Sequence, residues 1–275
     1  MADLARRRRL FRDLHASGCF VMPNPWDIGS ARLLASLGFR ALATTSGGFA
    51  FSRGLPDGAV SRDEMLAHIA EIVAATESPV NADFQAGYAD LPEAVAANVR
   101  LCIATGVAGL SIEDMREDHS LYDFSLAVER VQAARAAIDA SGDDVVLTAR
   151  SESFVAGHPD PLREACRRLN AFADAGADVL FAPGALDSEA ISAIVAAVSP
   201  KPINVMATAK NRSVAELALL GVRRVSLASA LARAALGGFL RVAREIAERG
   251  TFDGFASAAP AVDLNRFFRD EEWRR

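Results

Sequence analysis

Short, continuous apolar runs alternate with longer amphipathic segments along almost the whole chain of 275 residues. The apolar runs lack the polar alternation of a strand with one solvated face, and they are typical of parallel strands covered on both faces. The amphipathic segments have helical periodicity and begin at capping residues such as Asp27 and Ser61. Eight strands are predicted, at residues 20–22, 41–45, 80–82, 109–112, 145–149, 179–182, 203–205 and 224–227.

Eight strand–helix units in a chain of this length favour a (β/α)8 TIM barrel over an open doubly wound sheet. A dinucleotide-binding sheet needs a glycine-rich turn after its first strand, and this chain has Pro23-Asn-Pro-Trp-Asp27 there. No linker or composition break divides residues 1–275, which predicts a single domain. An extra helix is predicted at residues 2–16, a turn at Ser46-Gly-Gly48 with a loop after it, and a long final helix at 230–249.

The C-terminal segment, residues 251–275, is rich in aromatic side chains. These are Phe252, Phe255, Phe267, Phe268 and Trp273. A free solvated end would not carry so many of them, so the segment is expected to pack on the barrel or on a neighbouring subunit.

Charge and cysteine content narrow the functional classes. A net charge of -5 argues against a nucleic-acid partner, and the basic cluster at residues 6–9 is interpreted as a solvated first helical turn. Cys19, Cys102 and Cys166 form no C-x-x-C pair, which fits a reducing cytoplasm. No apolar run is long enough to span a membrane. A cytoplasmic protein without a membrane partner is predicted.

Polar residues gather where the predicted strands end. Because the carboxyl ends of parallel barrel strands meet at one face, these residues define the expected active-site face. They are Asn24, Trp26, Ser46, Gly47, Gly48, Asp83, Gln85, Glu113, Asp114, Arg150, Pro183, Asn204 and Ser229.

A metal site is predicted around Asp83. Asp83 and Glu113 end consecutive strands, and Asp57 can join them through a bound water. Carboxylate and water oxygens are the ligands that Mg²⁺ requires. Two alternatives stay open: Asp83 could cap the turn that follows it, and Glu113 could form a salt bridge with Arg150.

Ser46, Gly47 and Gly48 are predicted to bind a substrate carboxylate or a developing oxyanion, because they offer a hydroxyl and closely approaching N–H groups. A turn with only a topological role is the alternative. Arg150 is a bidentate donor suited to carboxylates. Trp26 and Asn204 are further candidates for substrate binding at the strand ends.

The few lysines and histidines limit the possible chemistry. Lys201 precedes a strand and Lys210 lies beyond one, so a Schiff-base mechanism is disfavoured. Of the four histidines, His119 is best placed for acid–base work, in the loop after the fourth strand. His15 and His68 are interpreted as ordinary helix residues.

Several motifs occur in order along the chain. They are Asn24-Pro-Trp-Asp-Ile-Gly-Ser-Ala-Arg32, Thr44-Thr-Ser-Gly-Gly48, Gly54-Leu-Pro-Asp57, Pro79-Val-Asn-Ala-Asp-Phe-Gln-Ala-Gly-Tyr88, Gly109-Leu-Ser-Ile-Glu-Asp114 and Thr148-Ala-Arg150. Together the motifs resemble those of the isocitrate lyase/phosphoenolpyruvate mutase superfamily. The resemblance implies a TIM barrel, a tetramer built from dimers that exchange the eighth helix, and C–C or P–C chemistry on a 2-oxo acid through an enolate.

The resemblance also implies metal ligands. Asp83 matches the direct ligand to Mg²⁺, with Mn²⁺ as an alternative ion. Asp57 and Glu113 match carboxylates that hold metal-bound waters, and Gln85 replaces a second acid, which is expected to weaken metal affinity.

On the substrate side, Ser46 and Gly47 match the carboxylate-binding turn, and Arg150 matches the arginine that steadies substrate and enolate. The loop at residues 114–124 lacks the cysteine of the lyases and the lysine of the mutases, which leaves His119 or Arg116 as possible replacements. Pro183 stands where relatives have a glutamate or a histidine.

These features predict a Mg²⁺-dependent lyase or decarboxylase of a small 2-oxo or 2-hydroxy di- or tricarboxylic acid, of the oxaloacetate or (methyl)isocitrate type. One alternative is a 2-oxo acid binding protein with little catalysis. A second alternative is phosphonopyruvate or phosphoenolpyruvate chemistry, which the missing lysine disfavours.

Overall fold

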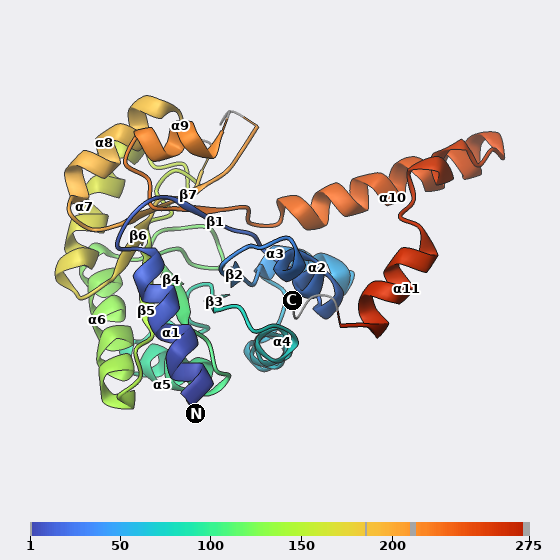
Figure 1. Ribbon diagram of the computed structural model, residues 1–275. Coiled ribbons are helices and arrows are strands. Elements are labelled where there is room, and N and C mark those ends of the chain that lie inside the picture. The colour runs from blue at the N-terminus through green and yellow to red at the C-terminus, as the bar shows by residue number, and fades with distance from the viewer. Residues whose placement is uncertain (1, 185, 210–212, 272–275) are drawn as a thin grey trace.

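Eight parallel strands form a nearly closed barrel in the computed structural model, which describes residues 2–184, 186–209 and 213–271 (Figure 1). The sheet order is β1-β8-β7-β6-β5-β4-β3-β2, and the Ala43 amide donates to the Pro23 carbonyl at 3.0 Å across the remaining gap. The strands are β1 (Phe20–Met22), β2 (Leu42–Ala43), β3 (Val80–Asp83), β4 (Gly109–Glu113), β5 (Val146–Arg150), β6 (Val179–Phe181), β7 (Ile203–Met206) and β8 (Arg224–Ser226). The TIM barrel prediction is confirmed.

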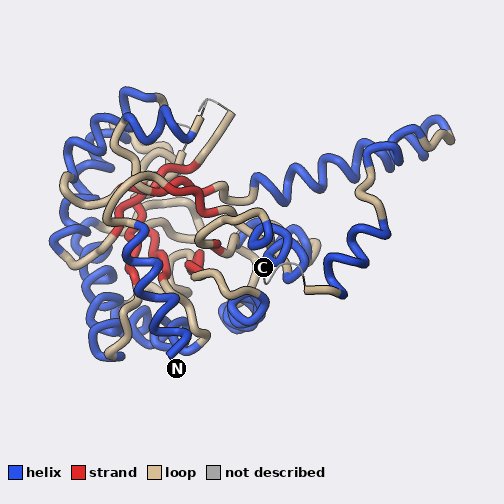
Figure 2. Tube along the Cα trace, in the orientation of Figure 1, coloured by secondary structure: helices blue, strands red, loops and turns tan. Residues whose placement is uncertain are grey.

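Helices surround the strands, as Figure 2 shows. They are α1 (Ala2–Leu14), α2 (Ile28–Ser36), α3 (Ser46–Ser52), α4 (Arg62–Ala75), α5 (Pro92–Ala104), α6 (Phe124–Ser141), α7 (Pro161–Asp174), α8 (Ser188–Val198), α9 (Val214–Leu219), α10 (Ala230–Arg249), the short 3-10 helix η1 (Asp253–Ser257) and α11 (Ala261–Arg269). The predicted cap of α4 is present, because the Glu64 amide donates to Ser61 Oγ and the Glu64 carboxylate accepts from the Ser61 amide. This reciprocal pair satisfies two N–H groups that the helix leaves without partners.

The prediction of a turn at Ser46-Gly-Gly48 is wrong, because these residues begin α3. Thr45 is the N-cap, and its Oγ1 accepts from the Gly48 amide at 3.2 Å. The two glycines are required by close packing rather than by a turn. A Cβ at Gly47 would lie 2.7 Å from Asp57 Oδ2, and one at Gly48 would lie 2.5 Å from Thr45 Cγ2. The backbone at Gly47 therefore lies close beside the Asp57 carboxylate.

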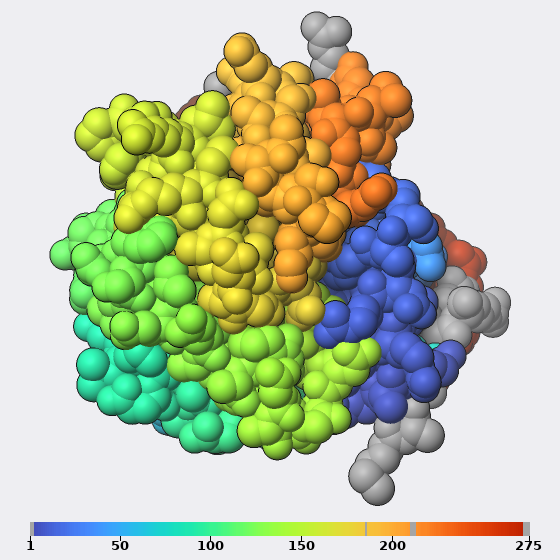
Figure 3. Space-filling model, turned by 90° about the vertical axis from the view of Figure 1, so that its left-hand side faces the viewer, coloured from blue at the N-terminus to red at the C-terminus, as the bar shows by residue number. Residues whose placement is uncertain are grey.

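Helix α1 closes one end of the barrel. Phe11 and Leu14 pack in a buried cluster with strand residues such as Phe20 and Val146. Figure 3 shows α1, in blue, against green and yellow segments from the middle of the chain. The interpretation of residues 6–9 as a solvated turn is wrong for Arg8, which is buried and donates to the Val107 carbonyl at 3.0 Å. Burial of its guanidinium ties α1 to the barrel.

Helix α10 extends away from the barrel, and after η1 the chain turns back so that Phe268 of α11 lies beside Gly29 of α2 (Figure 1). Helix α10 has the bounds predicted for the long final helix. Exposed apolar side chains occur along these elements, among them Phe239, Phe252, Phe255 and Val262. Trp273 lies outside the described residues.

Within the part of the chain that the structure describes, no helix combines the length and apolarity needed to cross a membrane.

Candidate active site

A cavity of about 130 Å³ lies inside the barrel toward the carboxyl ends of the strands. Its lining includes six of the residues predicted to bind the metal or the substrate or to act in catalysis, which are Ser46, Gly47, Asp57, Asp83, Arg150 and Asn204. These residues come from β3, β5, β7, α3 and the loop before α4, so the barrel brings together segments far apart in the sequence. The polar groups predicted at this face therefore line one cavity.

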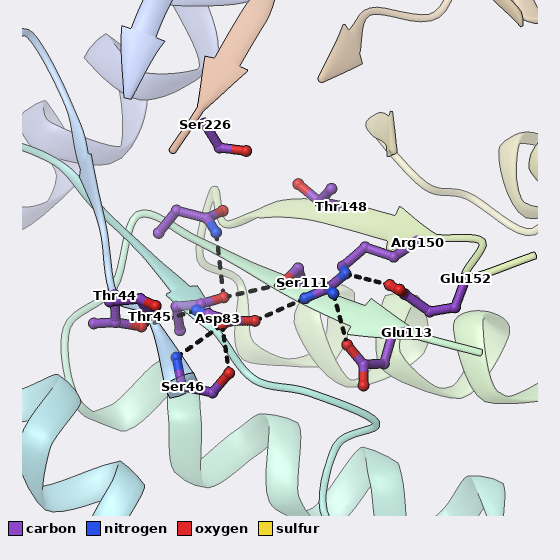
Figure 4. Close-up of polar contacts among 12 residues, drawn as sticks. Thr44, Thr45, Ser46, Asp83, Ser111, Glu113, Thr148, Arg150, Glu152 and Ser226 are labelled. Carbon is purple, nitrogen blue, oxygen red and sulfur yellow. Dashed lines mark hydrogen bonds and ion pairs between the residues drawn. The ribbon is translucent and has the colours of Figure 1, made fainter. Parts of the chain in front are cut away.

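Asp83 is held by three hydrogen bonds at the end of β3 (Figure 4). Its Oδ2 accepts from the Ser46 amide and from Ser46 Oγ, each at 2.9 Å. Its Oδ1 accepts from Arg150 Nη1 at 2.8 Å. A carboxylate has about four acceptor positions on its two oxygens. Three are engaged, and one is left for a cation or a water.

Arg150 contacts three carboxylates at once. Besides Asp83, its Nη2 lies 2.9 Å from Glu113 Oε2 and its Nε lies 2.8 Å from Glu152 Oε1. The alternative of a Glu113–Arg150 salt bridge is thus what the structure shows. One guanidinium cannot neutralise three carboxylates, so this side of the site carries an excess of negative charge.

Glu152 is a site residue that the sequence reasoning missed. It follows β5 two residues after Arg150 and is almost fully buried. Its amide donates to Asp114 Oδ1 at 2.7 Å, and Asp114 Oδ2 pairs with Arg168 Nη1 at 3.1 Å. The available sequence signal was its position just after the end of β5, which is comparable to the position of Asp114 just after the end of β4. These contacts hold the Arg150 guanidinium in one orientation.

Burial changes the proton affinity of these acids. Desolvation raises the pKa of Glu113 and of Glu152, and the charge of Arg150 offsets only part of this. Burial also raises the pKa of Asp57, with the nearby charge of Asp83 acting in the same direction. Removing this repulsion requires either protons or an added cation.

The donors around Asp83 suit a hard divalent cation. Carboxylate oxygens of Asp83 and Asp57 and the hydroxyl of Ser46 line the cavity together, and oxygen donors with water are what such an ion takes. Among the described residues, no three Asp, Glu, His or Cys side chains converge as direct ligands. The arrangement fits an ion with few protein ligands and several waters.

Five predicted residues do not line the cavity. Glu113 and Gln85 lie directly behind it, with the Glu113 amide donating to the Gln85 carbonyl at 3.0 Å. Gly48 packs against Thr45, and Trp26 is half-buried beside α2. His119 is exposed in the loop after β4, at a φ of 64°. Their functional roles stay predictions.

The floor of the cavity contains further polar groups that the sequence reasoning did not single out. Arg224, on β8, donates through Nε to Asn204 Oδ1 at 2.9 Å and through Nη2 to Thr148 Oγ1 at 3.0 Å. Asn204 Nδ2 donates to Ser226 Oγ at 2.9 Å. A charged residue inside an otherwise apolar strand was the available signal.

The lysines fit their sequence interpretation as far as they are described. Lys201 Nζ donates to the Ala177 carbonyl at 2.7 Å and does not line the cavity. Lys210 lies outside the described residues.

A TIM barrel with clustered acids and an arginine at the carboxyl ends of its strands has the active-site arrangement of the α/β barrel enzymes. Within that class, residues 11–247 match the phosphoenolpyruvate phosphomutase family. The chain belongs to this family, in the isocitrate lyase/phosphoenolpyruvate mutase superfamily of lyases and mutases, and it is an enzyme.

Three similar proteins illustrate the range of the family. A structure described as a lyase/mutase from Burkholderia cenocepacia is 48% identical, with a TM-score of 0.93 and coverage of 98% of this chain and 97% of that one. Oxaloacetate decarboxylase of Paraburkholderia xenovorans is 30% identical over 241 residues, which cover 84% of this chain and 77% of the relative. Oxaloacetate acetylhydrolase in complex with oxalate is 26% identical, with a TM-score of 0.85 and coverage of 98% and 96%.

Proposed function

We propose that the protein is a Mg²⁺-dependent lyase or decarboxylase of a small 2-oxo or 2-hydroxy di- or tricarboxylic acid. The observation that carries the proposal is the contact of Asp83 with both Ser46 and Arg150 at the cavity wall. This contact brings three groups together within one small cavity. They are a carboxylate of the kind that binds metal ions, the hydroxyl and N–H groups at the start of α3, and a cationic donor. The relatives named for oxaloacetate chemistry support this class of substrate.

Asp83 would hold the ion directly, while Asp57, Glu113 and Gln85 would hold its waters. When bound, Mg²⁺ (or Mn²⁺) polarises the carbonyl of a chelated 2-oxo acid. The acceptor position left on Asp83 and the raised pKa of Asp57 both favour a cation at this place.

Arg150 and the first turn of α3 would bind the reacting end of the substrate. The Arg150 guanidinium carries the positive charge that stabilises an enolate oxygen, and its three carboxylate partners keep it in place before the reaction starts. The N–H group of Gly47 would receive the substrate carboxylate. Asn204 lines the cavity and would contact the bound acid, whereas Trp26 and Gly48 lie outside the lining and would act through the residues that they pack against.

A proton donor is needed where the C–C bond breaks. Glu113 is the candidate because burial raises its pKa, and it would reach the substrate through a bound water because it lies outside the cavity lining. His119 lies on the loop at residues 115–125, outside the cavity, and would reach the substrate only after this loop moves. Arg116 on the same loop pairs with Asp90 at 3.2 Å.

We also propose a cytoplasmic tetramer in which paired subunits exchange α10. The exposed apolar side chains of α10, η1 and α11 support an assembly that covers them. Sedimentation of the full chain would give the subunit number, and a monomer at micromolar concentration would contradict the proposal.

The test is turnover of oxaloacetate, isocitrate, methylisocitrate and phosphonopyruvate by the purified protein with Mg²⁺. Asp83→Ala is the matched variant, assayed at the same Mg²⁺ concentration so that uncatalysed, metal-promoted decarboxylation is subtracted. Turnover that Asp83→Ala removes supports the lyase. Tight binding of oxo acids without turnover of any of them would instead favour a binding protein.

Gln85 and the absence of the lyase cysteine from the loop at 114–124 are the features that favour this binding-only alternative. Phosphonopyruvate chemistry has less support, because no lysine or histidine is found among the described residues that line the cavity.

A further inference from the structure

Arg224 is a buried guanidinium without a carboxylate partner among the described residues. It is 2% exposed and lines the floor of the cavity. Its three hydrogen-bond partners, Asn204 Oδ1, Thr148 Oγ1 and His15 Nε2, are all uncharged groups. A guanidinium has five N–H bonds, so this set leaves two of them available. An unpaired buried charge is unfavourable, and an anion in the cavity would relieve it.

His15 accepts from Arg224, whereas two hydroxyls beside Arg224 keep protons that they can donate. His15 Nδ1 lies 2.8 Å from the Phe11 carbonyl, which places the proton on Nδ1 and turns the Nε2 lone pair toward Arg224. The hydroxyls of Thr148 and Ser226 each accept one hydrogen bond and still have their own proton to give. In the view of Figure 4, Thr148 and Ser226 lie on the opposite side of Asp83 from Ser46.

Other buried arginines are satisfied differently. Arg130, outside the barrel, donates to the backbone carbonyls of Ala86, Ala89 and Asp90. Arg168 pairs with Asp114 and Glu164. Among the described residues, neither a backbone carbonyl nor a carboxylate accepts from Arg224, and Arg224 lines the cavity.

We propose that Arg224, Thr148 and Ser226 form a second anion subsite that receives the distal carboxylate of the substrate. This inference rests on the proposed function and narrows it to dicarboxylic 2-oxo or 2-hydroxy acids. The 2-oxo acid end lies at Asp83, Ser46 and Arg150, and the second carboxylate lies at the floor. A monocarboxylic acid of the same length leaves the guanidinium unpaired and is rejected for that reason.

The experiment compares the binding of three small acids by calorimetry in the presence of Mg²⁺, with NMR of each acid after the titration to check that it is intact. Malate carries a distal carboxylate, 2-hydroxybutanoate has a methyl group in its place, and oxalate reports on the Asp83 end alone. Wild type is expected to bind malate about 100-fold more tightly than 2-hydroxybutanoate. Arg224→Gln is expected to reduce this ratio to about threefold while leaving oxalate affinity unchanged.

Two further variants keep the test decisive. Thr148→Val removes a partner of Arg224 with little change of shape. It is expected to lower the ratio of malate affinity to 2-hydroxybutanoate affinity, and it keeps the test possible if Arg224→Gln does not fold. Arg130→Gln is the matched control, because it removes a buried guanidinium away from the cavity. It should keep the wild-type ratio.

Equal binding of malate and 2-hydroxybutanoate by wild type would overturn the subsite, as would equal weakening of malate and oxalate in Arg224→Gln. Turnover of oxaloacetate together with equal binding of malate and 2-hydroxybutanoate would refute the subsite but not the proposed reaction. An Arg224-dependent malate preference without turnover of any acid would keep the subsite and refute the proposed reaction. Tighter, Arg224-dependent binding of phosphonopyruvate than of oxaloacetate would assign the floor to a phosphonate and overturn the carboxylate assignment.

Discussion

The wall and the floor of the cavity have opposite charge imbalances. At the wall, one guanidinium, Arg150, serves Asp83, Glu113 and Glu152. At the floor, Arg224 has only uncharged partners. A folded protein normally pairs its buried charges, so the wall favours the binding of a cation and the floor favours the binding of an anion. This charge pattern matches the proposed metal chelate of a dicarboxylic acid.

The largest effect is expected at the wall from Arg150→Met. Three buried carboxylates lose their shared partner, and breaking a buried pair costs about 3–5 kcal/mol of unfolding free energy. Turnover should fall about 10²–10³-fold, as when a donor to a developing oxyanion is removed. Urea unfolding and steady-state kinetics measure both, and Mg²⁺ should restore part of the stability.

Arg135→Met is the control for this change. Arg135 pairs with Asp139 and Asp178 and does not line the cavity. It should lose stability while each folded molecule keeps its turnover. Wild-type turnover in Arg150→Met would show that the wall charges have no catalytic role.

Gln85→Asp should make the wall more negative and strengthen Mg²⁺ binding about tenfold, a change typical of groups that orient metal-bound waters. The backbone permits the change, because aspartate tolerates the positive φ of 47° at this residue. Calorimetric titration with Mg²⁺ measures the affinity, and Gln85→Asn is the neutral control. Equal Mg²⁺ affinity in the Asp and Asn variants would place Gln85 outside the metal's surroundings.

Asp57→Asn tests the repulsion between Asp57 and Asp83. Burial and the Asp83 charge raise the pKa of Asp57 above its ordinary value of 3.8. The folded state therefore binds this proton more tightly, and the stability from Asp57 is full below pH 3.8 and lost as pH rises through the raised pKa. Without Mg²⁺, Asp57→Asn should be more stable than wild type at pH 8 and lose this advantage at pH 4. With Mg²⁺, the stability difference between the variant and wild type at pH 8 should become smaller or change sign. A stability advantage of the variant that persists unchanged at pH 4 would contradict the charge explanation.

The smallest effect is expected at the floor, in the titration of His15. Burial, and then the Arg224 charge, lower the pKa of His15 to about 3. The sign is opposite to that of Asp57: the stability from a neutral His15 is full above about pH 6.5 and is lost as pH falls toward 3. NMR of the imidazole should show a neutral ring at pH 5 and a higher pKa in Arg224→Gln.

His68 is the reference for that titration, because burial lowers its pKa to about 4 without an arginine among the causes. A pKa of His15 that does not respond to Arg224→Gln would mean that the floor charge is already neutralised.

Much of the wall was predictable from sequence. Asp83, Glu113 and Arg150 each end a strand, and parallel strands in a barrel end at one face, so their meeting follows once the fold is recognised. The capping residue Ser61 and the bounds of α10 were also predictable, because caps and helical periodicity are local signals.

The floor was not predictable in the same way. Arg224 and Asn204 are paired across β8 and β7, and Thr148 and His15 reach Arg224 from β5 and from the turn after α1. Nothing local to these residues indicates that they meet. Glu152 was missed for a related reason, because its role depends on where the Arg150 side chain turns.

The sequence by itself determined the repeating units, the nearly closed barrel and the face that carries the acids. The hydrophobic periodicity of the helices and the order of residues along each strand are local features of the chain. Only the tertiary structure decided which charges are paired and which are left over. The charge pairing depends on the relative register of the strands and on the packing of α1 across one end of the barrel. Both are set by contacts between segments that are distant in sequence. The surplus carboxylates at Arg150 and the unpaired guanidinium of Arg224 are therefore properties of the fold.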